Sequence, residues 1–258
     1  MANTEPLENG CPNCGYPAGG QFCSRCGQEQ GELLPNLSAV VREVVSETLE
    51  VDGKLPRTLK ALVWPPGGLT LSWVAGRRSR FVSPFRLYLV AALVFFFAWP
   101  RTLLRGLLEA FTRGFVEGEG STAAAEVDES VAVGAETVVD ALPGMTIVFL
   151  VPVFAILLHL TNRRRMPLVG DVVAAIHVHV IVFLVAVLTV PFQTLGGAWE
   201  SVGGVLFLAT AGGYTWAEVA RVYALGALHS LVRTTLVLGL YLLASAFLIG
   251  IGLAVVLA

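Results

Sequence analysis

Five long apolar tracts constrain this chain more than any other feature of its sequence. A helix needs about 20 apolar residues to cross a bilayer, and the tracts approach or exceed that length. The first tract is short, and glycines and charged residues interrupt the fourth. We therefore predict an all-α polytopic membrane bundle of about five transmembrane helices. The tracts are Ser83 to Trp99, Pro143 to Thr161, Pro167 to Phe192, Val202 to about Val222 and about Leu231 to Ala258.

The composition agrees with a membrane protein and excludes most soluble classes. Of the 258 residues, 55% are hydrophobic and only 14% are charged, with a mean hydropathy of +0.72. Soluble domains are about 25% charged, so the chain lacks the charged surface of a cytosolic enzyme, a nucleic-acid-binding protein or a disordered protein. We expect the lipid bilayer as its environment and no nucleic acid as a partner.

The cysteines form two C-x-x-C pairs close to the N-terminus. Thiolates at this spacing ligate one tetrahedral metal ion, and four of them with no open position are typical of structural zinc. Iron in a rubredoxin-like site is the chemical alternative. The preceding residues are acidic and lack a signal-peptide core, which indicates reduced thiolates and a cytoplasmic zinc ribbon. The predicted ligands are Cys11, Cys14, Cys23 and Cys26.

Basic residues fall mostly on one predicted side of the membrane. Thirteen of the 17 lie in residues 36–86, in the connection after the second tract, and between the fourth and fifth tracts. The loop 101–142 instead holds three arginines and eight acidic residues. The positive-inside rule places the first set in the cytoplasm and the loop outside. We therefore expect a multi-pass protein of the inner (cytoplasmic) membrane with a cytoplasmic N-terminus.

The chain divides into three predicted parts. Residues 1–32 form the zinc ribbon, and residues 83–258 form the transmembrane domain with its outer loop. Residues 33–82 form a cytoplasmic amphipathic helix, with apolar positions from Leu37 to Leu49 at helical spacing, and then an interfacial linker. The tryptophans and arginines of the linker either contact lipid phosphates at the inner interface or are ordinary positive-inside flanks.

Ionisable side chains inside membrane spans are costly, so they are candidates for function. At 3.6 residues per turn, His177 and His179 face nearly opposite sides of a helix, whereas Asp171 and His179 roughly share a face. A site that joins His179 to Asp171, or to one of the other two histidines, is therefore favoured over one that joins His177 to His179. The candidate residues are His159, Asp171, His177, His179, Glu218, Arg221 and His229.

Three uses of these polar residues remain open from the sequence. They can bind a metal or haem, form a proton or ion pathway, or pack as hydrogen-bonded structural groups. Glu218 and Arg221 are three residues apart and are expected to pair on one helix face.

The order of short motifs resembles a known family. CPNCG and FCSRCGQ are followed by Asp52 and Lys54, Thr58-Leu59, PPGG at 65–68, GRRSRF at 76–81 and Pro84-Phe85. Over residues 11–86 this order is similar to the bacterial membrane family catalogued as domain of unknown function 3667. The resemblance implies a zinc ribbon followed by several spans, with no assigned activity. The later AAIHVHV is less specifically similar, and Gly170-Asp171 stands where the family often has an acidic-histidine pair.

No catalytic motif occurs in the sequence, whether of P-loop, GxSxG, GxGxxG or kinase type. We therefore predict a membrane adaptor or accessory subunit whose ribbon docks a cytoplasmic partner, in a membrane-protein complex or a homo-oligomer. One alternative is a small ion or solute transporter or channel that uses the inward-facing His, Asp and Glu residues. Another is a membrane metalloenzyme that uses the intramembrane histidines.

Overall fold

The computed structural model describes residues 10–17, 20–29, 54–102, 104–106, 109–110, 137, 139, 149–162 and 165–257. Within these residues the regular elements are helices, apart from an isolated bridge between Phe22 and Glu29. The predicted all-α class is confirmed. The predicted amphipathic helix from Leu37 to Leu49 and most of the loop 101–142 lie outside the described residues.

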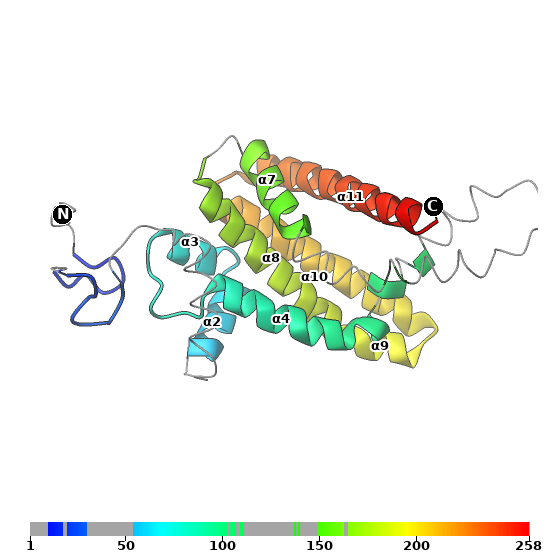
Figure 1. Cartoon of the computed structure of the whole chain (residues 1–258), viewed down its shortest axis with the longest axis horizontal. Helices are drawn as coiled ribbons and strands as arrows, with labels where there is room; N and C mark the ends of the chain where they lie inside the picture. Colours follow the sequence, from blue (N-terminus) through cyan, green and yellow to red (C-terminus); the bar gives the residue numbers. More distant parts are fainter. Residues whose placement is uncertain are drawn as a thin grey trace, which may run out of the picture.

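Helix α8 (Leu168–Leu188) is the centre of the bundle (Figure 1). It packs against α4 (Pro84–Ala98), α7 (Val151–Thr161) and α10 (Ala198–Val222). Its sequence is apolar all round except for a few polar residues, as expected of a helix with neighbours on several sides. Lipid tails are as apolar as these side chains, so close packing, rather than exclusion of water, holds membrane helices together.

The helix boundaries follow local sequence signals. Ser83 caps α4, its hydroxyl accepting from the Arg86 N–H at 3.4 Å, and Pro84 occupies the first turn, where its missing N–H costs nothing. Helix α8 begins directly after Pro167, and Pro191 lies in the first turn of the short helix α9 (Val190–Leu195). Prolines thus mark the starts of these three helices.

Three helical segments within the described part of the chain are long and apolar enough to cross a membrane. They are Pro84–Arg101, which joins α4 to the 3-10 helix η1 (Trp99–Arg101), Leu168–Leu195, which joins α8 to α9, and Ala227–Gly252 within α11 (Ala227–Leu257). Helix α7 is apolar but shorter, and residues 143–148 of its tract lie outside the described residues. Helix α10 is long enough, but glycines, Tyr214 and Thr215 make it less apolar. The number five therefore stays a prediction.

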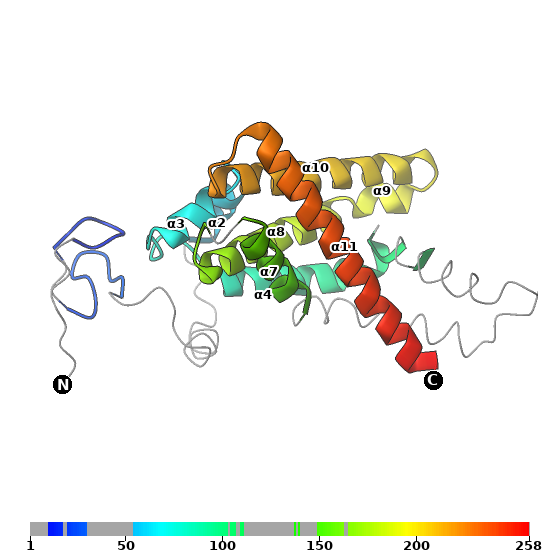
Figure 2. The ribbon, with the colours of Figure 1, turned by 90° about the horizontal axis from the view of Figure 1, so that it is seen from above.

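Helix α11 crosses the bundle obliquely, in contact with α7 and α10 (Figure 2). Leu242, Leu243, Phe247 and Val255 are all well exposed along it. A large exposed apolar face suits a helix that meets lipid on that side.

Helices α2 (Lys54–Val63) and α3 (Gly68–Val74) lie at the end of the bundle beside the ribbon (Figures 1 and 2). Both pack against α8, and α3 also contacts α10, so that Leu62 and Leu69 are completely buried. This part of the predicted linker therefore belongs to the bundle. Its Trp73 lies under the Arg78 guanidinium, 5.8 Å from the ring centre, whereas Trp64 is exposed.

Candidate functional site

The ribbon consists of two matching turns. In the first, the Cys11 N–H donates to the Tyr16 carbonyl and the Gly15 N–H to the Cys11 carbonyl, both at 2.7 Å. In the second, Cys23, Gln28 and Gly27 repeat this pattern at 2.8 Å. Gly15 and Gly27 both have φ = 71°, which glycine adopts without strain. The glycine after each C-x-x-C pair thus closes the turn.

The four sulfurs are arranged as a tetrahedral metal site requires. Cys11 Sγ lies 3.7 Å from Cys26 Sγ, and Cys14 Sγ lies 3.6 Å from Cys23 Sγ. All four sulfurs lie within 4.8 Å of one another. Zinc–sulfur bonds of about 2.3 Å in a tetrahedron separate the sulfurs by roughly 3.8 Å. The cysteines therefore fit a metal ion with no further position open.

The thiols of the cluster differ in acidity. Chiefly through a hydrogen bond from the Asn13 side chain, the pKa of Cys26 is lowered to about 6. A backbone hydrogen bond at Tyr16 acts in the same direction on Cys14, but desolvation and the neighbouring sulfurs outweigh it and raise its pKa to about 12. Four adjacent thiolates repel one another, and a bound cation removes that repulsion.

Gln28 joins the ribbon to the helical bundle. Its side-chain amide donates to the Gly76 carbonyl at 2.6 Å and accepts from the N–H groups of Arg78 and Ser79 at 3.1 and 3.2 Å. Gly76, with φ = 77°, lies against Pro12, where a Cβ would come within 3.1 Å of the proline ring. The ribbon is thereby fixed to the turn between α3 and α4.

A buried polar chain lies next to this attachment. Thr70 on α3 places its hydroxyl 2.7 Å from Nδ1 of His177 on α8 and donates to Oε1 of Glu218 on α10 at 2.6 Å. None of the three residues is more than 2% exposed. Three helices therefore meet at one hydroxyl group.

Asp171 has a separate set of partners. Its Oδ2 lies 2.6 Å from Nδ1 of His159 on α7, and its Oδ1 accepts from the hydroxyl of Tyr223. The Tyr223 carbonyl accepts in turn from the Arg165 guanidinium at 3.1 Å. Both carboxylate oxygens are satisfied, so this group ties α7, α8 and the end of α10 together as a structural link.

His179 is also fully hydrogen-bonded. Its Nδ1 donates to the Ala175 carbonyl at 2.7 Å, which leaves Nε2 to accept from the Tyr241 hydroxyl at 2.9 Å. Phe154 and Phe183 meet its ring edge to face. The expected separation of His177 and His179 to opposite sides is confirmed, since their partners lie on α3 and α11.

Two of the expected juxtapositions are not formed among the described residues. His179 hydrogen-bonds to neither Asp171 nor another histidine, because both of its ring nitrogens already have partners. Glu218 and Arg221 make no close ion pair there, although the Arg221 charge still acts on Glu218, whose Oε1 accepts from Thr70. His229 is exposed at the start of α11.

Metal-ligating side chains gather at one place in the described part of the chain, the four-cysteine cluster. The intramembrane histidines have threonine, tyrosine or a single aspartate as partners. These groups therefore provide no ligand set for a second metal.

Comparison with known families gives a match over the segment that carries α2, α3 and most of α4. Residues 52–96 match the family model described as a protein of unknown function (DUF3667). The resemblance expected from the sequence is confirmed there. Neither the curated proteins nor the solved structures contain a match.

The matched residues 52–96 include the turn that Gln28 contacts and Thr70 of the buried polar chain. Reasoning from ionisable residues alone missed Thr70, as well as Tyr223 and Tyr241. The sequence signal for Thr70 is a polar residue in an otherwise apolar stretch, Gly68–Val74. The signal for Gln28 is its place directly after the second cysteine turn.

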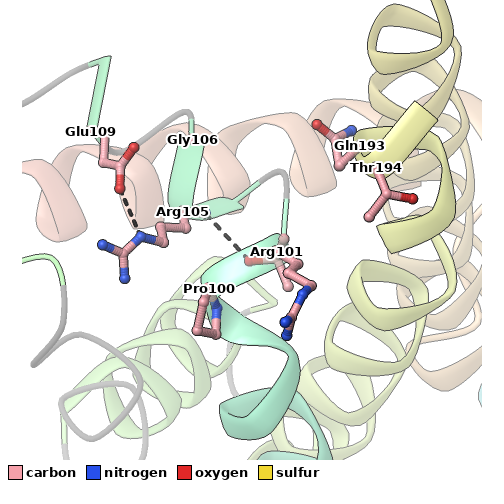
Figure 3. A pocket seen from close by; sticks show the side chains of 8 residues that line it. Pro100, Arg101, Arg105, Gly106, Glu109, Gln193 and Thr194 are labelled. Carbon is pink, nitrogen blue, oxygen red and sulfur yellow. Dashed lines mark hydrogen bonds and ion pairs between the residues drawn. The ribbon is translucent and has the colours of Figure 1, made fainter. Parts of the chain in front are cut away.

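A cavity of about 280 Å³ lies between the residues that follow α4 and helix α9 (Figure 3). Helix α9 is at the end of the bundle away from the ribbon (Figure 1). Arg101 and Arg105 line one side and Gln193 and Thr194 of α9 the other. Arg105 is paired with Glu109 at 2.7 Å. The cavity shares no residue with the cysteine cluster or the intramembrane polar groups.

Proposed function

We propose that this protein is a membrane adaptor or accessory subunit whose metal ribbon docks a cytoplasmic protein partner. The observation that carries the proposal is the attachment of the ribbon by Gln28, which holds a small metal-binding unit in a fixed position on a membrane bundle. Tyr16 and Phe22 remain 44% and 58% exposed on that unit. Aromatic side chains are enriched at protein interfaces, where they supply much of the binding energy.

The metal in this proposal is zinc in a structural role. The donor set of four thiols suits zinc, and iron is the chemical alternative. A ribbon of this size has too small a core to fold alone, so metal binding would supply its folding free energy. Gln28 then positions the folded ribbon on the bundle, and the exposed side chains of Tyr16 and Phe22 contact the partner.

The proposed location is the cytoplasmic side of the inner membrane. Reduced thiolates require a reducing compartment. The ribbon contacts the basic turn 77–80 through Gln28, and Arg165 lies just before the start of α8. Figure 1 shows the ribbon beside α3 at one end of the bundle. The positive-inside rule assigns that end to the cytoplasm.

Site-directed photo-crosslinking in native membranes tests the proposal. A photo-reactive phenylalanine analogue at position 22 should capture a second, different protein. The same analogue at position 64 is the matched control, since Trp64 is also an exposed aromatic near this end but lies off the ribbon. The double variant Tyr16→Ala with Phe22→Ala should abolish co-purification of the captured protein. Crosslinks from position 22 to lipid alone, or to another copy of this chain, would contradict the adaptor role.

A second candidate is a small ion or solute transporter. Its supporting observation is that two buried side chains, His177 and Glu218, each have an atom with no hydrogen-bond partner among the described residues. Flux assays on the full chain in liposomes test it. Passage of an ion or solute that Glu218→Gln abolishes supports transport, and no flux across a broad panel of ions and solutes contradicts it.

A further inference from the structure

The buried chain of His177, Thr70 and Glu218 is open at both of its ends. In the middle, the Thr70 hydroxyl bridges His177 Nδ1 at 2.7 Å and Glu218 Oε1 at 2.6 Å. At the ends, His177 Nε2 and Glu218 Oε2 find no hydrogen-bond partner in the described residues. Buried polar atoms are nearly always hydrogen-bonded, so two orphans at the two ends of one chain need an explanation.

Within the described residues, unpartnered polar atoms also occur on Trp73, Tyr88, Trp99, Gln193 and Thr234, but the other buried carboxylate and the other buried histidine of α8 are fully hydrogen-bonded. Asp171 has partners on both carboxylate oxygens, and His179 has partners on both ring nitrogens. Asp171 and His179 are therefore structural links between helices. The chain through Thr70 differs because His177 and Glu218 each have one polar atom without a hydrogen bond in the described residues.

The hydrogen atoms of the chain have two consistent arrangements. When Glu218 is ionised, Thr70 donates its single hydrogen to Glu218, so His177 must carry its hydrogen on Nδ1 and leave Nε2 as a free acceptor. When Glu218 is protonated, it donates to Thr70, Thr70 donates to Nδ1, and His177 carries its hydrogen on Nε2. The same three side chains fit both arrangements without moving.

We propose that His177, Thr70 and Glu218 form a buried proton relay that takes up one proton and stores it on Glu218. A new N–H bond forms at His177 Nε2, and the Nδ1–H bond breaks as its proton passes to the Thr70 oxygen. The former Thr70 proton passes to Glu218 Oε1, where a new O–H bond forms. One proton is added in total, His177 ends neutral in its other tautomer, and no oxidant or reductant takes part.

Two other groups on α10 act on Glu218, namely the Tyr214 hydroxyl one turn before it and the Arg221 charge one turn after it. The Tyr214 hydroxyl on α10 donates to the Leu62 carbonyl at 2.8 Å, and Tyr223 donates to Asp171. Helix α3 contains no titratable residue. The other titratable or charged residues of the neighbouring helices are Lys54, Arg57 and Lys60 of α2, Arg86 and Tyr88 of α4, His159 of α7, Asp171 and His179 of α8, and Glu200 of α10.

The relay goes beyond the adaptor role and does not depend on it. It makes a specific claim that a structural hydrogen-bond chain does not, namely that protonation of Glu218 and the tautomer of His177 change together. A merely structural triad keeps one fixed arrangement of hydrogens.

Infrared difference spectroscopy between two pH values tests this coupling on the full chain in lipid nanodiscs with isotope-labelled histidine. The wild type should show a protonated-carboxyl band that Glu218→Gln removes, together with a histidine tautomer signal that His177→Gln removes. Glu218→Gln should also abolish the tautomer signal, because it removes the carboxylate that accepts the relayed proton.

Thr70→Val removes the bridging hydroxyl at nearly constant shape and should abolish the joint change, while Thr70→Ser should retain it. Thr234→Val is the matched control, since Thr234 is another buried threonine, whose hydroxyl has no partner in the described residues. Thr234→Val should behave as the wild type. A wild-type carboxyl band without a tautomer change overturns the relay, whether or not Thr70→Val folds. A joint change that persists in folded Thr70→Val also overturns it.

Discussion

The side-chain amide of Gln28 donates to the backbone carbonyl of Gly76 at 2.6 Å, across 48 residues of sequence. The same side chain accepts from two further backbone N–H groups, so one residue satisfies three backbone groups of the α3–α4 turn. Because backbone groups make these contacts, the turn's conformation rather than its side chains defines where the ribbon attaches. The attachment makes the ribbon part of the membrane bundle's surface.

Replacement of Gln28 should release the ribbon from the bundle. Gln28→Ala removes three hydrogen bonds and leaves partly buried backbone groups unpaired, which costs about 1–3 kcal/mol. Hydrogen exchange of the Arg78 and Ser79 amides should then accelerate. Gln21→Ala is the control, since Gln21 is an exposed ribbon glutamine that donates to Glu29 at 3.5 Å, and it should leave those amides protected. Equal exchange in the two variants would count against the attachment.

The cysteine cluster should hold a single metal ion per chain. Cys11→Ser with Cys14→Ser removes two of the four ligands and should abolish metal binding as measured by elemental analysis of the purified protein. His177→Ala and His179→Ala, singly or together, should leave the metal content unchanged. Metal that is retained in the double cysteine variant, or lost from the histidine variants, would contradict this assignment.

Tyr223 should stabilise the packing of α8 and α10 through Asp171. Tyr223→Phe removes the hydroxyl that donates to Asp171 Oδ1 and leaves a buried carboxylate oxygen unpaired, at a cost of about 1–3 kcal/mol in the free energy of unfolding. Thermal unfolding in detergent should show a lower midpoint. Tyr16→Phe removes a hydroxyl from an exposed tyrosine and should leave the midpoint unchanged.

Two glycines of α10 should respond oppositely to the same substitution. A Cβ at Gly203 would lie 2.7 Å from the Phe192 Cβ, so Gly203→Ala should separate α9 from α10 and lower the unfolding midpoint. A Cβ at Gly212 meets nothing within 4 Å. Gly212→Ala should therefore be neutral or raise helix stability by about 0.5–1 kcal/mol. A destabilising Gly212→Ala would indicate a close neighbour at this face.

Local features of the sequence predicted the elements that depend on local chemistry. The two C-x-x-C pairs predicted the four-cysteine cluster, and the first apolar tract, which begins at Ser83, predicted where α4 starts. Helical periodicity correctly predicted that His177 and His179 face apart. In each case the deciding residues lie within a few positions of one another.

The polar partnerships could not be predicted in the same way, because the partners come from distant elements. Thr70 and Glu218 are 148 residues apart, and nothing near either residue indicates the other. Thr70 is harder to find from the sequence, because an uncharged hydroxyl costs less to bury than an ionised group and is therefore common in apolar helices. Glu218 was instead paired with Arg221 by helical spacing, which takes no account of α3.

The central claim is that a metal-folded ribbon is fixed to the membrane bundle at the α3–α4 turn. Hydrogen exchange of the Arg78 and Ser79 amides in the full-length protein, before and after metal removal by a chelator, tests it most directly. These amides donate to Gln28, which follows the second cysteine turn, so they should lose protection when the metal leaves. Addition of metal back to the chelated protein should restore it. Protection that is unchanged by metal removal would contradict the claim.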